Sequence, residues 1–302
     1  MIINMNTGYF HKEYARSIKY NAKTIHLKES EAWLLKRNIP DTGLFDVANC
    51  YPLLCCQNWD KLKYDIHNLS KKIVSLSIVT DPFAEIEKSN IANTFNIFKP
   101  FKKHFIVDLK SKNNFNLHHK REISRSLKKN IELEHCENPL EYIDQWDSLY
   151  TGLINRHNIR KSISFSRSLF INQFKVPGIF VFRAVRDNET IGMALWYVSN
   201  RNAYYHLTAY SDIGYKTGCS YALMNFSLNF FRENGTYKAS LGSGSGLVEN
   251  KNDGLTKFKA GWSNYTKTAF FCGKIINHCE YDNIIKKSKN YSSFPAYRNP
   301  NE

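Results

Sequence analysis

Three strand-like segments separated by very short turns constrain the fold of this sequence most strongly. They are rich in β-branched and aromatic residues and span residues 179–185, 191–198 and 203–210. The turns between them fall at residues 187–190 and 200–202. Connections this short join antiparallel neighbours, because a parallel pair needs a crossover of a dozen or more residues. The sequence therefore predicts a three-stranded antiparallel meander.

A crossover pattern follows this meander. Residues 218–233 carry apolar side chains at helical spacing and end at Asn234-Gly235, a common helix stop. A short strand over 237–241 comes next, and the crossover would place it parallel to the strand at 203–210. Two helices precede the meander. One starts at Pro139 with Asn138 as its predicted N-cap, and the other spans 166–174.

The first part of the chain has weaker patterns. Alternation predicts strands at 72–80 and 101–109, and apolar spacing predicts a helix over 118–130. We expect a short helix at 29–37, an irregular stretch at 43–60, and loose order over the polar residues 1–25. We place the domain boundary just before the Asn138 cap. This gives an N-terminal domain of residues 1–135 and a C-terminal domain of residues 136–302.

Positive charge dominates the composition. Lys and Arg number 42 against 27 acidic residues, a formal net charge of +15. This surplus favours anionic partners, although a compositional bias toward Lys explains it equally well. The surplus is sharpest between Lys99 and Lys129, which hold ten basic residues and two acidic ones. This basic cluster either binds phosphate groups or forms a solvated face.

The cysteines and the N-terminus bear on location and on metals. The seven cysteines form no C-x-x-C pair, so we expect reduced thiols and no metal site. Residues 1–20 lack the apolar segment of a secretion signal, and no apolar run is long enough for a membrane-spanning helix. These features predict a cytoplasmic protein.

Several phrases resemble the Fem-type branch of the GNAT superfamily, also called BioF2-like acyltransferases. The strands GMALWY (192–197) and AYYHLTAY (203–210) resemble the paired central strands of that family. The other matching phrases are REISRSLK at 121–128, SYAL at 220–223, LGSG at 241–244 and DGLTKFKAGW at 253–262. The resemblance covers about residues 70–275, and the last of these phrases is the most specific one.

This resemblance implies an α/β fold of the α+β kind. It would have a mixed, mostly antiparallel sheet flanked by helices, in two GNAT-like halves of which the N-terminal one is incomplete. The implied activity is an acyltransferase that moves an acyl or aminoacyl group to an amine. The donor would be acyl-CoA or aminoacyl-tRNA, used as a co-substrate, with no permanently bound cofactor. The implied partners are this anionic donor and an amine-bearing acceptor such as a cell-envelope precursor, a polysaccharide precursor or a small metabolite. Contact with a membrane surface is possible, and no DNA is expected.

The predicted donor site lies between the third strand and the long helix. Its residues are Tyr215, Lys216, Thr217, Gly218, Cys219 and Ser220. Free N–H groups at a helix start favour anions, so this segment could hold the donor's phosphates. GNAT proteins usually carry Q/R-x-x-G-x-G/A here, and this sequence retains only part of that pattern. The alternative is an ordinary loop in which Ser220 caps the helix.

Two residues of the third strand are candidates for catalysis. His206 could accept a proton at neutral pH, because a histidine side chain titrates near pH 6.5. The alternative is a hydrogen-bonded core histidine, which is the commoner case. Tyr210, at the end of the strand, could act as a general acid toward the leaving group.

The remaining candidates would bind substrate. Gly242, Ser243 and Gly244 form a glycine-rich loop that allows close approach of a substrate. Asp253 could orient an ammonium group or cap a helix, and Lys259 could hold a phosphate. Arg156 could bind the acceptor, although a cation near the end of a helix is also expected from the helix dipole.

A different class of function remains open. A non-catalytic protein that binds RNA or an anionic surface could use the basic cluster between Lys99 and Lys129. That class predicts salt-sensitive binding without turnover.

Overall fold

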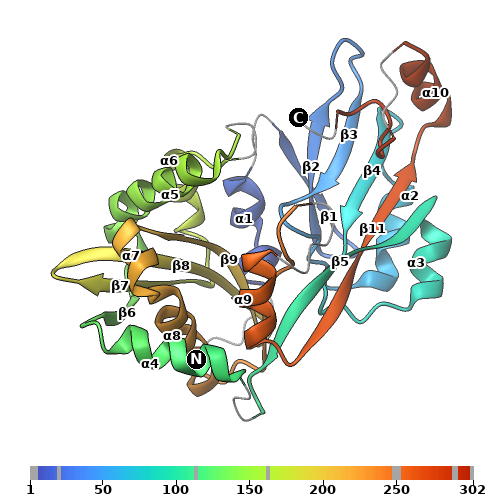
Figure 1. The fold of residues 1–302 in the computed structure, drawn as a ribbon. Coiled ribbons are helices and arrows are strands. Elements are labelled where there is room, and N and C mark those ends of the chain that lie inside the picture. The colour runs from blue at the N-terminus through green and yellow to red at the C-terminus, as the bar shows by residue number, and fades with distance from the viewer. Residues whose placement is uncertain are drawn as a thin grey trace. The chain divides into compact units, whose positions relative to one another are not determined.

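A computed structural model describes residues 6–18, 22–111, 115–160, 164–246, 253–287 and 292–299. The chain forms two compact units, each built from segments that are distant in the sequence (Figure 1). The first unit comprises Met1–Glu13 and Lys103–Lys267, and the second comprises Tyr14–Lys102 and Thr268–Glu302. Two strands, β5 (Ile97–Asp108) and β11 (Tyr265–Ile275), run from one unit into the other.

The first unit contains a mixed sheet with the strand order β5-β10-β9-β8-β7-β6. Its other strands are β6 (Glu132–Cys136), β7 (Ile179–Arg186), β8 (Glu189–Ser199), β9 (Asn202–Tyr210) and β10 (Lys238–Ser240). Strands β6 to β9 pair antiparallel, and β10 pairs parallel with β9 and antiparallel with β5. The meander and the parallel last strand predicted from turn lengths are therefore confirmed.

Helices cover both faces of this sheet. In Figure 1, α5 (Ile143–His157) and α6 (Arg167–Gln173) lie on one face, and α8 (Cys219–Glu233) and α4 (Leu117–Leu127) lie on the other. Trp146 and Phe170 fill the core under α5 and α6, while Trp196 and Phe231 fill the core under α8. The unit also contains η1 (Gly8–Phe10), η3 (Pro139–Tyr142), α7 (Asp212–Thr217) and α9 (Gly254–Trp262).

Four helix predictions in this unit hold, and two details differ. The predicted helices correspond to α4, α5, α6 and α8, and the Ser166 side chain caps α6 by accepting from the Leu169 N–H. Asn138 makes no capping hydrogen bond, and the 3₁₀ turn η3 stands between it and α5. Between the third strand and the long helix, where the sequence predicted no further element, lies helix α7, whose N-cap is Ser211.

The second unit is also a sheet with helices, in the strand order β1-β2-β3-β4-β11. Its own strands are β1 (Lys23–Leu27), β2 (Ala32–Asn38), β3 (Phe45–Asn49) and β4 (Ile73–Val79). Among these five strands, β3 and β4 pair parallel and the other neighbouring pairs are antiparallel. Its helices are α1 (Lys12–Ser17), which begins in the other unit, η2 (Trp59–Lys61), α2 (Leu62–His67), α3 (Lys88–Thr94) and α10 (His278–Lys287).

Three expectations for this part of the chain were wrong. Residues 29–37 do not form a helix: Ala32 and Leu34 are fully buried and Trp33 is half-buried, the alternation of strand β2. Strand β3 lies within the stretch expected to be irregular, and η1, α1 and β1 order the described residues before 25. The strands predicted at 72–80 and 101–109 are present as β4 and β5.

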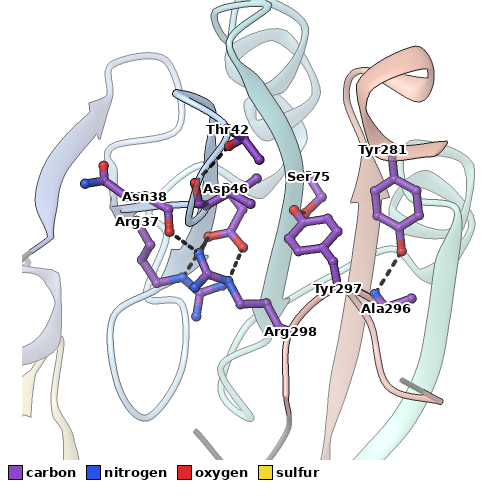
Figure 2. Close-up of polar contacts among 10 residues, drawn as sticks. Arg37, Asn38, Thr42, Asp46, Ser75, Tyr281, Ala296, Tyr297 and Arg298 are labelled. Atoms are coloured by element: carbon purple, nitrogen blue, oxygen red, sulfur yellow. Dashed lines mark hydrogen bonds and ion pairs between the residues drawn. The ribbon is translucent and has the colours of Figure 1, made fainter. Parts of the chain in front are cut away.

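A buried carboxylate links the two chain segments of which the second unit is built (Figure 2). Asp46 on β3 is fully buried and accepts hydrogen bonds from Arg37 Nε at 2.9 Å and from Arg298 Nε at 2.8 Å. Arg298 also donates to the Asn38 carbonyl at 2.6 Å. Nearby, the hydroxyls of Tyr297 and Ser75 lie 2.7 Å apart. The C-terminal segment is therefore part of the second unit, which an N-terminal domain of residues 1–135 would leave incomplete. The predicted boundary itself lies within β6 of the first unit.

We expect Arg298→Met to lower the free energy of unfolding by about 3 kcal/mol, because it leaves a buried carboxylate with one of its two cationic partners. Urea denaturation measures this change. Lys286→Met, at an exposed position of α10, is the control and should change stability by less than about 0.5 kcal/mol. A change of less than about 1 kcal/mol in Arg298→Met would show that Arg37 alone satisfies Asp46.

Candidate functional site

The central strands of the first unit separate at a defined point. Strand β10 pairs with β9 only at Asn202, Ala203 and Tyr204 over the described residues, whereas β8 pairs with β9 as far as Tyr210. Beyond Ser240 the chain turns toward β5, where the Leu241 N–H donates to the Phe105 carbonyl at 2.9 Å. From Tyr205 onward, β9 therefore has a strand partner on one side, and its other edge faces away from β10.

A β-bulge in β9 lies directly beyond this separation. Leu195 of β8 pairs with Leu207 and Trp196 pairs with Tyr205, so His206 is the additional residue. A bulge changes which face of the sheet the following side chains occupy. Tyr205 accordingly packs in the core under α8, whereas Leu207 packs in the core under α5.

His206 is enclosed on this strand. Its Nδ1 lies 3.0 Å from the Tyr9 hydroxyl, and its Nε2 lies 3.2 Å from Gln173 Oε1. An amide oxygen only accepts, so Nε2 carries the proton and Nδ1 accepts from Tyr9. The rings of Tyr9 and Tyr197 pack around the imidazole, and burial lowers the pKa of His206 to about 3. This geometry is that of a core histidine, and the role of His206 as a base remains a prediction.

Tyr210 lies at the far end of β9 on the α8 side. Its hydroxyl is 3.4 Å from that of Tyr205. Its ring packs against Tyr215 and lies so close to Gly192 that a Cβ there would overlap it. Burial raises the pKa of Tyr210 well above its ordinary value. The phenol therefore keeps its proton at neutral pH, as a general acid would, and that role also remains a prediction.

The predicted donor segment forms the corner between α7 and α8. Gly218 takes the left-handed conformation (φ 68°) that lets α7 end and α8 begin, and no side chain caps the N-terminus of α8. Lys129 Nζ donates to the carbonyls of Lys216 and Thr217, at 3.2 Å each. The Cys219 side chain is buried, whereas Tyr215 and Lys216 are exposed and Ser220 is half-buried. The start of α8, which no side chain caps, thus lies beside residues whose carbonyls bind the Lys129 ammonium group.

The glycine-rich loop and α9 form a second group. Lys259 is buried and its Nζ donates to the Ser243 carbonyl at 2.7 Å. Asp253 caps α9 by accepting from the Leu255 N–H at 2.8 Å. A Cβ on Gly244 would overlap the Thr256 hydroxyl, and Gly242 has a φ of 75° close to the Lys259 ammonium. In the described structure these side chains hold the loop against α9, and their substrate contacts remain predictions.

Helix α4 contacts both groups through residues that the sequence analysis did not select. His119 near its start is buried, its backbone N–H donates to Asn116 Oδ1 at 2.8 Å, and its Nε2 donates to the Phe258 carbonyl at 2.8 Å. A Cβ on Gly261 would overlap the His119 ring. The sequence holds one signal for this contact, because Gly261 lies inside the phrase at 253–262 and glycine allows close approach of a neighbour.

A second missed pair lies where β9 and β10 separate. His104 of β5 and Ser240 of β10 are both buried, with His104 Nδ1 3.2 Å from the Ser240 hydroxyl oxygen. That oxygen also accepts from the Gly242 N–H at 3.3 Å. The two residues are 136 positions apart, and only the antiparallel pairing of β5 with β10 brings them together.

Arg156 borders a hollow of about 460 Å³ at the other side of α7. It forms an ion pair with Asp212, and its guanidinium lies 4.3 Å above the Tyr215 ring. Tyr210 lines the same hollow. Arg156 and Tyr210 therefore lie near the donor segment, whereas Ser243 and Lys259 belong to the loop group.

Other candidate sites add little. A hollow of about 610 Å³ between α2, α3 and the end of β11 contains none of the predicted site residues. Within the described ranges, no three His, Cys, Asp or Glu side chains are placed to hold a metal ion. No helix in the described part of the chain is long and apolar enough to cross a membrane.

The burial of His206 predicts a specific pH dependence of stability. The folded pKa is about 3, whereas an exposed histidine titrates near 6.5, so the unfolded chain binds the additional proton between these values. The contribution of the neutral His206 to the free energy of unfolding is thus present above pH 6.5 and is lost as the pH falls toward 3. Between pH 7 and pH 5 we expect the protein to lose about 2 kcal/mol more than a His206→Gln variant loses. Urea denaturation at both pH values tests this, and equal losses would show that His206 titrates normally.

The contact between Gly261 and His119 gives a second prediction. Alanine in a helix interior ordinarily stabilises relative to glycine, but Gly261→Ala should destabilise by about 2 kcal/mol because its methyl group overlaps the imidazole. Adding His119→Ala should remove most of that penalty in thermal denaturation. Gly254→Ala is the matched control in α9, since its Cβ would meet no neighbour within 4 Å. A penalty that persists in the double variant would place the strain elsewhere.

Comparison with known proteins was informative only for structure, since no family model and no curated protein matches this sequence. The crystal structure of FemX matches with a TM-score of 0.68 at 14% identity, covering 90% of this chain and 93% of that chain. A C-terminal domain (DUF2156), named for lysylphosphatidylglycerol synthetase and from Agrobacterium fabrum, matches with a TM-score of 0.61 at 14% identity, covering 91% and 88%. L-PGS from Bacillus licheniformis matches with a TM-score of 0.58 at 14% identity, covering 92% and 95%.

These similarities extend over both units of the chain. At this level of identity they establish the fold and leave the substrates open. The meander of β7, β8 and β9, the crossover helix α8 and the parallel pairing of β9 with β10 are the elements that the sequence predicted. The chain therefore shares its fold with the FemX and L-PGS structures.

Proposed function

We propose that this protein is an N-acyltransferase that transfers an acyl or aminoacyl group from a phosphate-bearing donor to an amine. The observation that carries the proposal is the separation of β9 from β10 beyond Tyr204, in the same unit as the uncapped N-terminus of α8. A donor with an extended arm needs both features. Its arm needs backbone N–H and C=O groups to which it can hydrogen-bond, and its phosphates need the positive N-terminal end of a helix.

Strand geometry supports this arrangement. Tyr204 and Tyr210 are six residues apart on β9, which corresponds to about 20 Å of strand. The edge of β9 can hydrogen-bond to amide groups of the arm, as an added strand would. At the far end, the N-terminus of α8 with Lys129 and Lys216 offers N–H groups and positive charge to phosphates.

The chemistry requires few groups. The neutral amine nitrogen adds to the acyl carbon, and backbone N–H groups stabilise the oxyanion. The bond from the acyl carbon to the donor's sulfur or oxygen then breaks, and the proton lost by the amine ends on that leaving atom. Tyr210, which keeps its proton, could supply it. His206 accepts a hydrogen bond from Tyr9 through Nδ1, so its action as base would require that contact to open.

The similar structures bear on the choice of donor. One of them is named for a putative lysylphosphatidylglycerol synthetase, a name that states an aminoacyl group joined to a lipid. This supports aminoacyl transfer, with aminoacyl-tRNA as donor, over transfer from acyl-CoA. Both donors are cytoplasmic molecules, so the proposal includes a cytoplasmic location and no permanently bound cofactor. A cell-envelope precursor, a polysaccharide or a small metabolite would carry the acceptor amine.

One observation favours the non-catalytic alternative. On α4, Lys120, Arg121, Arg125 and Lys128 are exposed and make a basic face. Such a face binds RNA or an anionic membrane surface by charge alone. Under the main proposal, the same face holds the body of a charged tRNA.

Titration of the purified protein with acetyl-CoA, and then with charged and uncharged tRNA at fixed salt, tests the proposal. Saturable binding of acetyl-CoA selects an acyl-CoA donor, and preference for charged over uncharged tRNA selects an aminoacyl donor. Equal binding of both tRNAs without turnover selects the non-catalytic alternative. Binding of neither donor overturns the proposed function.

A charge placed at α8 tests the phosphate site directly. Ser220→Asp should weaken donor binding about tenfold or more, because a carboxylate at the helix start repels phosphate. The same change should not lower the melting temperature, since an acidic residue in the first turn stabilises a helix. Ser220→Asn is the neutral control of similar size. Unchanged affinity in the aspartate variant would move the phosphate site away from α8.

A further inference from the structure

The hollow beside α7 is lined by one face of helix α5. Ser148, Gly152 and Arg156 follow one another at intervals of four residues, so they share a face of this helix. Across the hollow lie the end of β9 and the start of α7, with Tyr210, Ser211 and Asp212. Its volume of about 460 Å³ is within the range of small-molecule sites.

Gly152 is an unexpected residue at the centre of this wall. It lies well inside a helix of 15 residues, where glycine is about 1 kcal/mol less favourable than alanine. Its backbone does not have a positive φ, and a Cβ built on it would meet nothing within 4 Å. Neither the conformation nor a close neighbour requires glycine at this position. The effect of the missing side chain is to leave the hollow open.

Two charged side chains border the hollow, Arg156 from the α5 wall and Asp212 from the opposite wall. Arg156 is held between the Asp212 carboxylate, with which it forms an ion pair, and the Tyr215 ring at 4.3 Å. Tyr215 in turn packs against Tyr210, with ring centroids 5.6 Å apart. The Arg156 side chain is 42% exposed and that of Asp212 is 77% exposed, so a ligand can reach both.

We propose that this hollow binds a small zwitterionic amino compound, namely a free α-amino acid or an end group of the same chemistry. Its carboxylate would lie on Arg156 and its ammonium group on Asp212, replacing the ion pair between these two residues. A guanidinium offers two parallel N–H groups to a carboxylate, which also fixes the orientation of the ligand. Assigning this compound as the acceptor rests on the proposed transferase function, whereas the binding site itself does not.

Isothermal titration calorimetry with L-alanine as the probe, in the absence of any donor, tests the site. Glycine, L-serine and L-lysine extend the probe set. Propionate lacks the ammonium group and ethylamine lacks the carboxylate, so each should bind at least tenfold more weakly than the amino acids. Saturable binding of an amino acid with this selectivity supports the site. Binding of none of the four, or equal binding of propionate and ethylamine, overturns it.

Two sets of variants locate the binding. Gly152→Leu fills the hollow and should abolish amino-acid binding without lowering the melting temperature, because leucine favours a helix more than glycine does. Thr151→Leu, at the exposed neighbouring position, is the matched control and should bind normally. Arg156→Gln and Asp212→Asn should each weaken binding tenfold or more. Full binding by Gly152→Leu would overturn the proposal. Because no donor is present, failure of the phosphate site at α8 leaves this result unaffected.

Discussion

The short parallel pairing between β9 and β10 is the constraint on which the first unit depends. A parallel pair requires a crossover, and α8 supplies it by packing across the sheet over Trp196 and Phe231. Three residues of β10 are enough to position the strand, after which its chain continues along β5. The same geometry sets the edge of β9, the start of α8 and the position of the glycine-rich loop. A longer pairing would cover the edge of β9 that the proposed donor uses.

Helix α7 connects the two proposed binding sites. Its first residue, Asp212, borders the hollow next to α5, and its last residue, Thr217, leads into Gly218 at the start of α8. Ser211 caps the helix at one end, and Lys129 binds the carbonyls at the other. Both ends are therefore stabilised by side chains from fixed elements. A six-residue helix held in this way fixes the position of the proposed acceptor site relative to the proposed donor site.

Several buried polar side chains in this protein hold segments of the chain against one another. His206, His119 and Lys259 each sit among hydrogen-bond partners, and Asp46 lies between two arginines. Buried polar groups of this kind are costly unless satisfied, so they define which segments must come together. Arg298 brings the C-terminal segment to β3, and His119 brings α4 to α9. Titratable groups near a proposed site are thus poor guides to catalysis unless their hydrogen bonds are known.

The sequence alone determined the elements whose evidence is local. The meander follows from turn length, and the crossover helix follows from apolar spacing. The phrases at 192–210 and 241–262 carried the resemblance from which the mixed, mostly antiparallel sheet was expected. It did not determine strand β2, because Ala-Trp-Leu-Leu fits a helix as well as a strand until Trp33 and Leu34 are seen to face different surroundings.

Tertiary structure decided the rest. The bulge at His206 depends on register with β8, the pair of His104 and Ser240 on strand pairing, and the hollow at Gly152 on where α5 lies over β9. Each of these joins residues far apart in the sequence, and local propensity carries no information about such contacts. The physical reason is that burial and pairing are properties of the assembled sheet, whereas turn length and periodicity are properties of the chain.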